Sequence, residues 1–475
     1  MDANVIGDGL HRSAKLAMDS GEAATVEDAL RLFEGYRLRI DVGPDIAWSP
    51  TLQAVLLTAV NTGRRCFLGG VEVTGCLEAE LLIQWMECRS IAEAIRTLQG
   101  SITEEPDIAA PRIVIGDVQK GYSESEFQIR ATFDGWRGGV MPLNDPSRLS
   151  ERGEFTPAGV LAGGLAVSEA FQFVRGRNAL AGRRSVGLSL WRPDSEKSWL
   201  DDSELGPILD LLPSKLWLIG LGHLGQAYLW TLGFLPYRDA RDCSFVLQDY
   251  DSLVFANDST SLLTDRKIVG RKKTRAMADW CEERGFGTRI LERRFSADFR
   301  LNDEEPLVAL CGVDNEGARA DLENVGFSQV VEAGIGTGNE EYLAFQMHCF
   351  PSSRSARSHW SPSSSGREVD SIISQPAYQS LATEGLEQCG LTTLAGRSVG
   401  AAFVGATVSA IVIAELLRMC LGEQRYQVID GSLRSLEHHL AILSDGSSPP
   451  FNPGLTNAKA PFSVEPTWGS RRVLI

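Results

Sequence analysis

The chain has 475 residues, of which 43% are hydrophobic and 23% are charged, and its formal net charge is −16. This length allows about two to three domains with ordinary cores, and the composition is that of a soluble globular protein. The acidic balance argues against a nucleic-acid-binding surface, which requires clustered Lys and Arg side chains.

Membrane and disulfide-rich classes are also disfavoured. The start of the chain has neither the basic nor the apolar region of a secretory signal, and the most apolar run, 399–414, is short for a bilayer helix. The nine cysteines include no C-x-x-C pair, so we predict neither a disulfide framework nor a structural zinc site. We expect a cytoplasmic protein with no membrane span.

The first 200 residues are expected to form an α/β domain. The predicted helices lie at 26–36, 52–60, 80–90 and 159–176, and the predicted strands at 65–70, 112–117 and 185–191.

A glycine-rich turn follows an apolar strand in the stretch KLWLIGLGHLG. Gly220, Gly222 and Gly225 have G-x-G-x-x-G spacing, and a helical pattern follows them. Such glycines let the backbone approach a phosphate at a helix N-terminus. Because Gly is common in this chain, the turn alone fits a dinucleotide site, another nucleotide site or a packing turn.

Polar residues after the next strands favour a triphosphate. The strand at 244–248 ends in Asp249, a carboxylate suited to ribose hydroxyls, and Lys273 follows. The strand at 307–313 ends in Asp314, which is suited to Mg²⁺. Hydride transfer requires neither a lysine nor a metal-binding acid here. The set therefore favours ATP with Mg²⁺ over a nicotinamide cofactor.

The sequence resembles the ThiF/MoeB-like adenylyltransferases, which include the activating enzymes of ubiquitin-like proteins. The resemblance lies, in order, in GLGHLG, QDYDSLVFAN, IVGRKK, GVDNEGAR and the stretch from CGLTTLAG to AIVIAELLR. It implies an α/β, Rossmann-like ThiF-type adenylation fold. It also implies that Asp249 binds ribose, Asn257 and Lys273 bind phosphates, and Asp314 binds Mg²⁺. The nucleotide site is expected to comprise Gly220, Gly222, Gly225, Asp249, Asp251, Asn257, Lys273, Asp314, Asn315 and Arg319.

A second small-residue helix, expected near 405–422, is similar to 159–176 and has Glu415 where the first has Glu169. We infer a repeat of one inactive and one active copy. In the first copy GGVEVTG is expected at the glycine turn, and no equivalent of Lys273 is found. The competing interpretation is an unrelated α/β domain with a chance Gly/Ala helix. Because the family works as dimers, we expect an internal pseudo-dimer or a homodimer.

One departure from the family concerns the triphosphate. The family has an arginine three residues after the Asn, where this chain has Thr260. Members often take an arginine from near the N-terminus of the partner domain, which makes Arg12 a candidate. Arg354 and Arg357, in a Ser/Arg-rich stretch, are further candidates.

The segment from 351 to about 388 matches the crossover loop under which the family threads its partner's C-terminal tail. Its first part, 351–367, is poor in apolar residues and is expected to form a mobile loop. Cys389 follows, where ThiF-like proteins carry a reactive cysteine, and a thiol is a suitable nucleophile for an acyl-adenylate. Cys349 is the alternative.

The resemblance implies that the chain adenylates the C-terminal glycine of a ubiquitin-like protein with ATP. It would then form a thioester on Cys389 and transfer the protein to a conjugating enzyme. The expected domains are an inactive copy at 1–200, an active copy at 201–440 and a tail at 441–475. Without zinc ligands or a docking domain, the chain most resembles the bacterial activating enzymes of Bil-type conjugation operons, which are implicated in antiviral defence against phage.

Three alternatives stay open. A sulfur-carrier or small-peptide adenylyltransferase would need no conjugating enzyme. An NAD-dependent oxidoreductase is supported only by the glycine turn and Asp249. A catalytically dead nucleotide-binding scaffold would result if no arginine compensated for Thr260.

Overall fold

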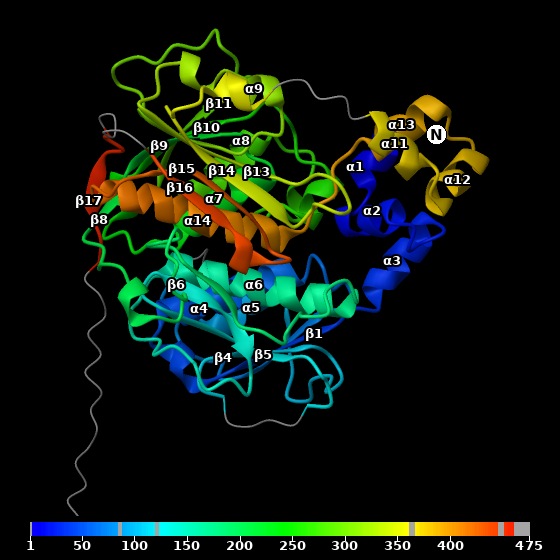
Figure 1. The fold of residues 1–475 in the computed structure, drawn as a ribbon, viewed down its shortest axis with the longest axis horizontal. Coiled ribbons are helices and arrows are strands. Elements are labelled where there is room, and N and C mark those ends of the chain that lie inside the picture. Colours follow the sequence, from blue (N-terminus) through cyan, green and yellow to red (C-terminus); the bar gives the residue numbers. More distant parts are fainter. Residues whose placement is uncertain (1, 84–87, 119–122, 361–365, 445–450, 460–475) are drawn as a thin grey trace, which may run out of the picture.

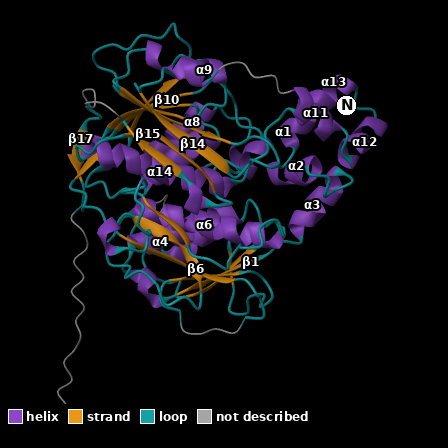
Figure 2. Ribbon diagram, viewed as in Figure 1, coloured by secondary structure: helices purple, strands orange, loops and turns teal. Residues whose placement is uncertain are grey.

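The computed structural model describes residues 2–83, 88–118, 123–360, 366–444 and 451–459. Two α/β layers face each other across a central layer of helices, and a helical lobe lies at one side (Figures 1 and 2). The β-sheet of each layer is formed by one half of the chain.

The N-terminal sheet has seven strands in the order β3-β2-β1-β4-β5-β6-β7. The first five strands in this order are parallel, and β6 and β7 are antiparallel to their neighbours. The strands are β1 (Leu38–Val42), β2 (Val71–Gly75), β3 (Ser101–Ile102), β4 (Arg112–Ile115), β5 (Gln128–Asp134), β6 (Arg137–Pro142) and β7 (Val186–Ser189). The helices of this half are α4 (Pro50–Gly63), α5 (Ile91–Thr97) and α6 (Thr156–Val174).

The C-terminal sheet has the order β11-β10-β9-β12-β13-β14-β15-β16. Its strands are β9 (Lys215–Ile219), β10 (Ser244–Gln248), β11 (Gly287–Leu291), β12 (Val308–Cys311), β13 (Gln329–Ile335), β14 (Ala344–Phe350), β15 (Tyr426–Ser432) and β16 (Leu440–Leu443). The helices are α7 (His223–Gly233), α8 (Lys273–Glu282), α9 (Glu316–Ala320) and α14 (Ala402–Cys420). A separate pair joins β8 (Leu211–Pro213) to β17 (Leu455–Asn457).

The two sheets share one topology. The first seven strands of the C-terminal sheet repeat the order of the N-terminal sheet, and here too the change from parallel to antiparallel pairing follows the fifth strand. The duplicated Rossmann-like α/β fold expected from the sequence is therefore confirmed. The domain boundaries near residues 200 and 440 stay predictions.

Helices α6 and α14 pack against each other between the sheets (Figure 1). A Cβ atom on Gly164 would lie 2.6 Å from Thr407 Oγ1, so the small residue permits the close approach. Both helices are long and apolar enough to cross a membrane. However, 89% and 94% of their apolar windows are buried inside the protein. Packing against protein accounts for their apolar surfaces.

The helical lobe joins the N-terminal segment of the chain to residues 366–395. It contains α1 (Ala3–Gly9), α2 (Arg12–Asp19), α3 (Val26–Glu34), α11 (Gly366–Ile373), α12 (Pro376–Thr383) and α13 (Gln388–Ala395). Buried Lys15 Nζ donates to Asp19 Oδ2 and to the carbonyl of Ala395, and Tyr378 Oη donates to Asp19 Oδ1. These bonds hold α2 against α12 and the end of α13.

Three predictions for the N-terminal half were wrong. Residues 65–70 form a turn after α4 rather than a strand, and GGVEVTG contains β2, because Val71 and Val73 pair with β1 in the buried sheet. The turn equivalent to the glycine turn is GPDIAWSP, 43–50, directly after β1.

The third wrong prediction is the helix at 80–90. The described part of that segment is not helical, and the helix α5 begins at Ile91 because Ser90 and Glu93 form a capping box there. Residues 84–87 lie outside the described residues.

The segment expected to be a loop at 351–388 is largely helical where it is described. It contains α10 (Ala356–His359), α11 and α12. Prolines and polar residues suggested a loop, but Ala356, Ala377, Tyr378 and Leu381 are buried by tertiary packing. Residues 361–365, within the stretch predicted to be mobile, lie outside the described residues.

Candidate functional site

A cavity of about 610 Å³ opens at the carboxyl ends of β9, β10 and β12. Ligands of open α/β sheets bind at this edge. The structure brings nine of the ten predicted nucleotide-site residues to the cavity wall: Gly220, Gly222, Asp249, Asp251, Asn257, Lys273, Asp314, Asn315 and Arg319. The tenth, Gly225, lies behind the turn, where a Cβ atom would come within 1.9 Å of the Gly220 carbonyl oxygen.

Asp249 is bound to the glycine turn. Its Oδ2 accepts a hydrogen bond from the Leu221 backbone N–H at 2.7 Å, and its Oδ1 accepts one from Asp251 N–H at 2.9 Å. Gly220 has a φ of 84°, a conformation that favours glycine, and α7 begins directly after the turn. The turn and the carboxylate at the end of β10 thus form one rigid corner of the cavity.

Lys273 lies between two carboxylates. It is the first residue of α8, and its Nζ lies 3.0 Å from Asp251 Oδ2 and 3.7 Å from Asp249 Oδ2. The ammonium group is thereby held at the cavity wall, where it can reach an anionic ligand.

The three predicted site residues that follow β12, namely Asp314, Asn315 and Arg319, differ in their contacts. Asn315 caps α9, with its Oδ1 accepting from Ala318 N–H at 2.9 Å. Arg319 donates from Nε to the Val313 carbonyl at 2.7 Å and lies 3.0 Å from Glu332 Oε1, so it supports the loop. Asp314 is exposed and forms no ion pair with the described residues. Its carboxylate is therefore available to a ligand in the cavity.

The helical lobe contributes two arginines to the same cavity. The backbone N–H of Arg12 donates to Ser259 Oγ at 3.1 Å, and its Nη1 is buried without a hydrogen-bond partner among the described residues. Burial lowers the pKa of Arg12, as does the nearby Arg397. Arg397 lies between α13 and α14, and its Nη1 is 2.7 Å from Asp8 Oδ1. Sequence analysis named Arg12 as a candidate but missed Arg397.

Thr260 also lines the cavity, but the two loop arginines proposed to replace its missing charge do not. Arg357 pairs with Asp321 at 3.3 Å, and Arg354 Nη2 donates to the Ser358 carbonyl at 3.3 Å. The position of Arg12 makes it the better candidate for that charge.

The two candidate cysteines have contrasting environments. Cys389 is exposed near the start of α13 and does not line the cavity. Cys349 is buried in β14, and burial raises the pKa of its thiol well above the usual value. Of the two thiols, only that of Cys389 is accessible to a substrate.

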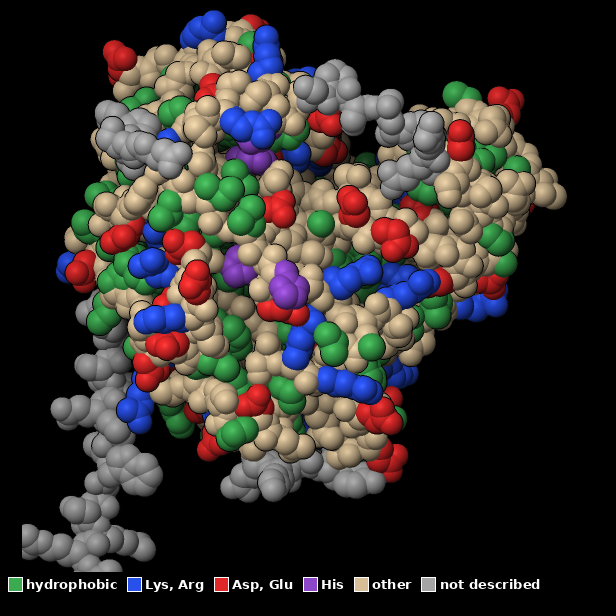
Figure 3. All heavy atoms as spheres, viewed as in Figure 1, with side chains coloured by type: hydrophobic (Ala, Val, Ile, Leu, Met, Phe, Trp, Pro, Cys, Tyr) green, Lys and Arg blue, Asp and Glu red, His purple; other side chains and the backbone are tan. Residues whose placement is uncertain are grey.

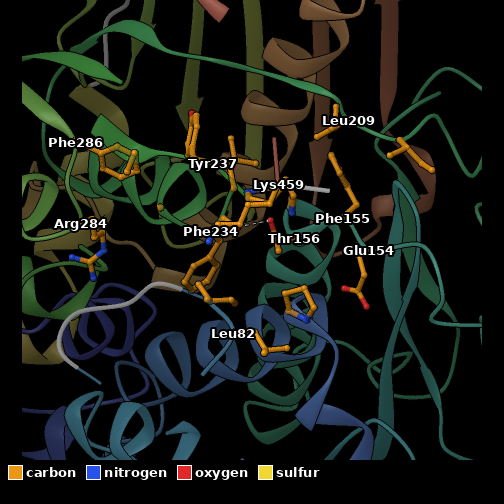
Figure 4. A pocket seen from close by; sticks show the side chains of 18 residues that line it. Leu82, Glu154, Phe155, Thr156, Leu209, Phe234, Tyr237, Arg284, Phe286 and Lys459 are labelled. Atoms are coloured by element: carbon orange, nitrogen blue, oxygen red, sulfur yellow. Dashed lines mark hydrogen bonds between the residues drawn. The ribbon is translucent and has the colours of Figure 1, made fainter. Parts of the chain in front are cut away.

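A second cavity, of about 110 Å³, lies where the two halves meet (Figure 4). Its walls are mostly apolar and include Phe155, Phe234 and Tyr237, and Thr156 Oγ1 donates to the Phe234 carbonyl. None of the predicted site residues lines it.

The visible surface has no large region of one charge. Basic and acidic side chains alternate over the face shown in Figure 3, despite the net charge of −16. Among the described residues, no group of three or more His, Cys, Asp and Glu side chains is arranged to hold a metal ion.

Comparisons with known proteins gave matches along most of the chain. The family described as BilD N-terminal domain matches residues 37–190, and the BilD C-terminal domain family matches residues 212–423. The Bacterial E1-like protein BilD of Collimonas sp. (strain OK412) is 42% identical over 451 residues, which cover 94% of this chain and 96% of that protein.

Solved structures gave weaker similarities. E. coli MccB with MccA-N7isoASN is 12% identical, with a TM-score of 0.31, over 49% of this chain and 65% of MccB, just under two thirds of its length. E. coli tRNA N6-threonylcarbamoyladenosine dehydratase, TcdA, in complex with AMP is 14% identical, with a TM-score of 0.28, over 44% of this chain and 86% of TcdA.

Proposed function

Since this chain belongs to the BilD family, whose Collimonas member is named an E1-like protein, we propose that it is an ATP-dependent activating enzyme for a ubiquitin-like protein. The observation that carries this proposal is the cavity at the strand ends. It combines a glycine turn, Asp249, Lys273, and two side chains with free capacity among the described residues, Asp314 without an ion pair and Arg12 with an unpartnered Nη1.

The residues of the cavity suit a nucleoside triphosphate. The glycine turn and the start of α7 would present backbone N–H groups to phosphates, and Asp249, at the end of β10, is the proposed ligand of the ribose hydroxyls. Lys273, at the start of α8, and Arg12, at the start of α2, provide positive charge from two different helices. Mg²⁺ is commonly held by ATP phosphates with one or two carboxylates, and Asp314 is the carboxylate available here. The ion would neutralise charge on the phosphates.

The proposed reaction is an adenylyl transfer followed by an acyl transfer. The C-terminal carboxylate of the ubiquitin-like protein attacks the α-phosphorus of ATP, forming the acyl-phosphate bond and releasing pyrophosphate. Lys273 and Arg12 stabilise the charge that moves onto the leaving phosphates. The Cys389 thiolate then attacks the acyl carbon, forming a thioester and releasing AMP. Transfer of the thioester to a conjugating-enzyme cysteine would complete the pathway.

Nucleotide binding tests the cavity assignment. Calorimetric titration with ATP should show Mg²⁺-dependent binding, and Asp314→Asn should weaken it at least about tenfold with Mg²⁺ but little without it. Asp303→Asn, at an exposed acid outside the cavity, is the matched control. Equal affinities of wild type and Asp314→Asn in Mg²⁺ would contradict the proposed role of Asp314.

A further inference from the structure

The end of α4 in the N-terminal half packs against residues 257–264 of the C-terminal half. This 257–264 loop begins with Asn257, the predicted phosphate ligand, and includes Thr260, and both side chains line the cavity. The loop is therefore in contact with the inactive copy on one side and with the nucleotide cavity on the other.

Arg65, in the turn that follows α4, makes most of the hydrogen bonds between this region and the loop. It donates to the backbone carbonyl and Oδ1 of Asp258, the latter at 3.1 Å. Its Nη2 also donates to the carbonyls of Leu262 at 3.1 Å and Thr264 at 3.0 Å. The side chain is only 1% exposed and does not line the cavity. Arg65 therefore holds both ends of the loop without being able to touch a nucleotide.

Two neighbours of Arg65 reinforce this contact. Arg64 Nη2 donates to Asp258 Oδ1 at 2.9 Å and to the Thr264 carbonyl at 3.2 Å, and Asn61 Nδ2 donates to the Leu262 carbonyl at 3.0 Å. Burial alone would raise the pKa of Asp258, but Arg64 and Arg65 hold it below the usual value. The carboxylate is thus kept ionised as the acceptor for both guanidinium groups.

The loop is bound on its other side to the glycine turn. Gln226 Oε1 accepts hydrogen bonds from Leu263 N–H and Thr264 Oγ1, both at 3.0 Å. The same side chain donates from Nε2 to the Leu221 carbonyl at 3.0 Å. A shift of the loop would therefore disturb the turn that carries Gly220 and Gly222.

We propose that Arg65, assisted by Arg64, is a positioning residue that aligns the 257–264 loop of the active copy for nucleotide binding. The inference rests on the proposed function and gives the inactive copy a part in it. Residues 257–264 include no Lys or Arg, so the loop itself has no cationic side chain with which to bind the phosphates. Alignment from outside, by the fixed fork of a guanidinium, lets Asn257 meet the phosphates without a prior rearrangement.

The test compares Arg65→Met and Arg65→Lys with wild type in the full chain. A lysine can donate to at most three of the acceptors that Arg65 uses, and a methionine to none. We expect the Kd for Mg²⁺–ATP to rise at least about tenfold in Arg65→Met and by an intermediate factor in Arg65→Lys. Arg37→Lys is the control, because Arg37 is 51% exposed, pairs with Glu72 within the N-terminal half and does not line the cavity.

Hydrogen exchange separates positioning from a general loss of stability. In Arg65→Lys, exchange should accelerate in peptides that contain Ser261 and Leu263 and remain unchanged in β9 and β12. If Arg65→Met does not fold, Arg65→Lys and Asp258→Asn decide the question. Folded variants with wild-type Kd, or faster exchange throughout the C-terminal sheet, would overturn the proposal. If wild type itself binds no ATP, the proposed function fails and this inference with it.

Discussion

Glu169 and Glu415 occupy the same position in two helices of 19 residues, α6 and α14. Each carboxylate accepts a backbone hydrogen bond from the chain that leads into the next strand of its own half, from Gly182 N–H at 2.8 Å and from Tyr426 N–H at 2.7 Å. The duplication therefore extends from strand order to individual buried acids. Their partners differ, because Glu415 Oε2 pairs with Arg418 at 2.8 Å whereas Arg184 lies 4.0 Å from Glu169.

Because Arg184 lies farther from Glu169 than Arg418 does from Glu415, we expect Glu169 to make the stability of the protein depend on pH. Burial raises the pKa of Glu169 from 4.5 to about 7, against the hydrogen bond from Gly182 and the charge of Arg184. The folded state therefore binds this proton more tightly than the unfolded state, so stability falls as the pH rises from about 4.5 to 7. Between pH 4.5 and pH 8, wild type should lose about 3 kcal/mol relative to Glu169→Gln in urea unfolding. Parallel pH profiles of the two proteins would show that Glu169 is not the group responsible.

Because α6 and α14 pack closely, adding one methyl group between them should lower the free energy of unfolding. A Cβ on Gly164 would lie 2.6 Å from Thr407 Oγ1 and 3.2 Å from the Phe403 carbonyl oxygen, whereas one on Gly9 would meet nothing within 4 Å. Gly164→Ala should lower the free energy of unfolding by about 1–3 kcal/mol, despite the better helix propensity of Ala. Gly9→Ala is the matched control, and equal unfolding midpoints for both variants would mean that the α6–α14 contact is not as tight as described.

Arg12, whose Nη1 has no hydrogen-bond partner among the described residues, is expected to contribute to the rate of adenylation. Arg12→Ala should lower the rate of ATP–pyrophosphate exchange by about 100-fold, because a donor that meets developing charge on the phosphates is lost. The measurement is the exchange rate at saturating partner protein, together with the melting temperature. Arg241→Ala, at an arginine that is 82% exposed, should leave the exchange rate unchanged. Full activity of a folded Arg12→Ala protein would exclude Arg12 from the reaction.

The positions of the cysteines predict where the thioester forms. Cys389→Ala should abolish an adduct that is sensitive to dithiothreitol but leave pyrophosphate exchange intact, because the residue does not line the nucleotide cavity. Non-reducing gels would detect the adduct. Cys76→Ala removes another exposed thiol, in the N-terminal half, and should have no effect. An adduct that persists in Cys389→Ala and disappears in Cys349→Ala would reverse the assignment despite the burial of Cys349.

The sequence predicted the C-terminal half better than the N-terminal half. In the C-terminal half, β9 is followed by the glycine turn, β10 by Asp249 and β12 by the loop that carries Asp314, so site residues and secondary structure mark the same places. Strand β11, which no site residue follows, was not predicted from the sequence. The Bil-type resemblance is confirmed by the family matches. In the N-terminal half no such residues marked the elements, and the apolar run at 81–83 suggested a helix although Ile83 packs into the core from a loop.

The residues that form contacts between the two halves could not be predicted from the sequence around them. Arg65 and Asp258 are 193 positions apart, and nothing near Arg65 distinguishes it from a surface arginine after a helix. Arg397 lies between two glycines of a recognised motif but reaches the cavity only because Asp8 of α1 holds it there. The sequence therefore predicted the residues proposed to contact a nucleotide more readily than those proposed to position them.

ATP–pyrophosphate exchange with a ubiquitin-like protein tests the central claim most directly. Wild type should catalyse exchange only when the partner protein retains its C-terminal glycine carboxylate, and Asp314→Asn should lower the rate by at least about 100-fold. Exchange that proceeds equally well without the partner, or with its terminal glycine removed, would contradict activation of a ubiquitin-like protein by this chain.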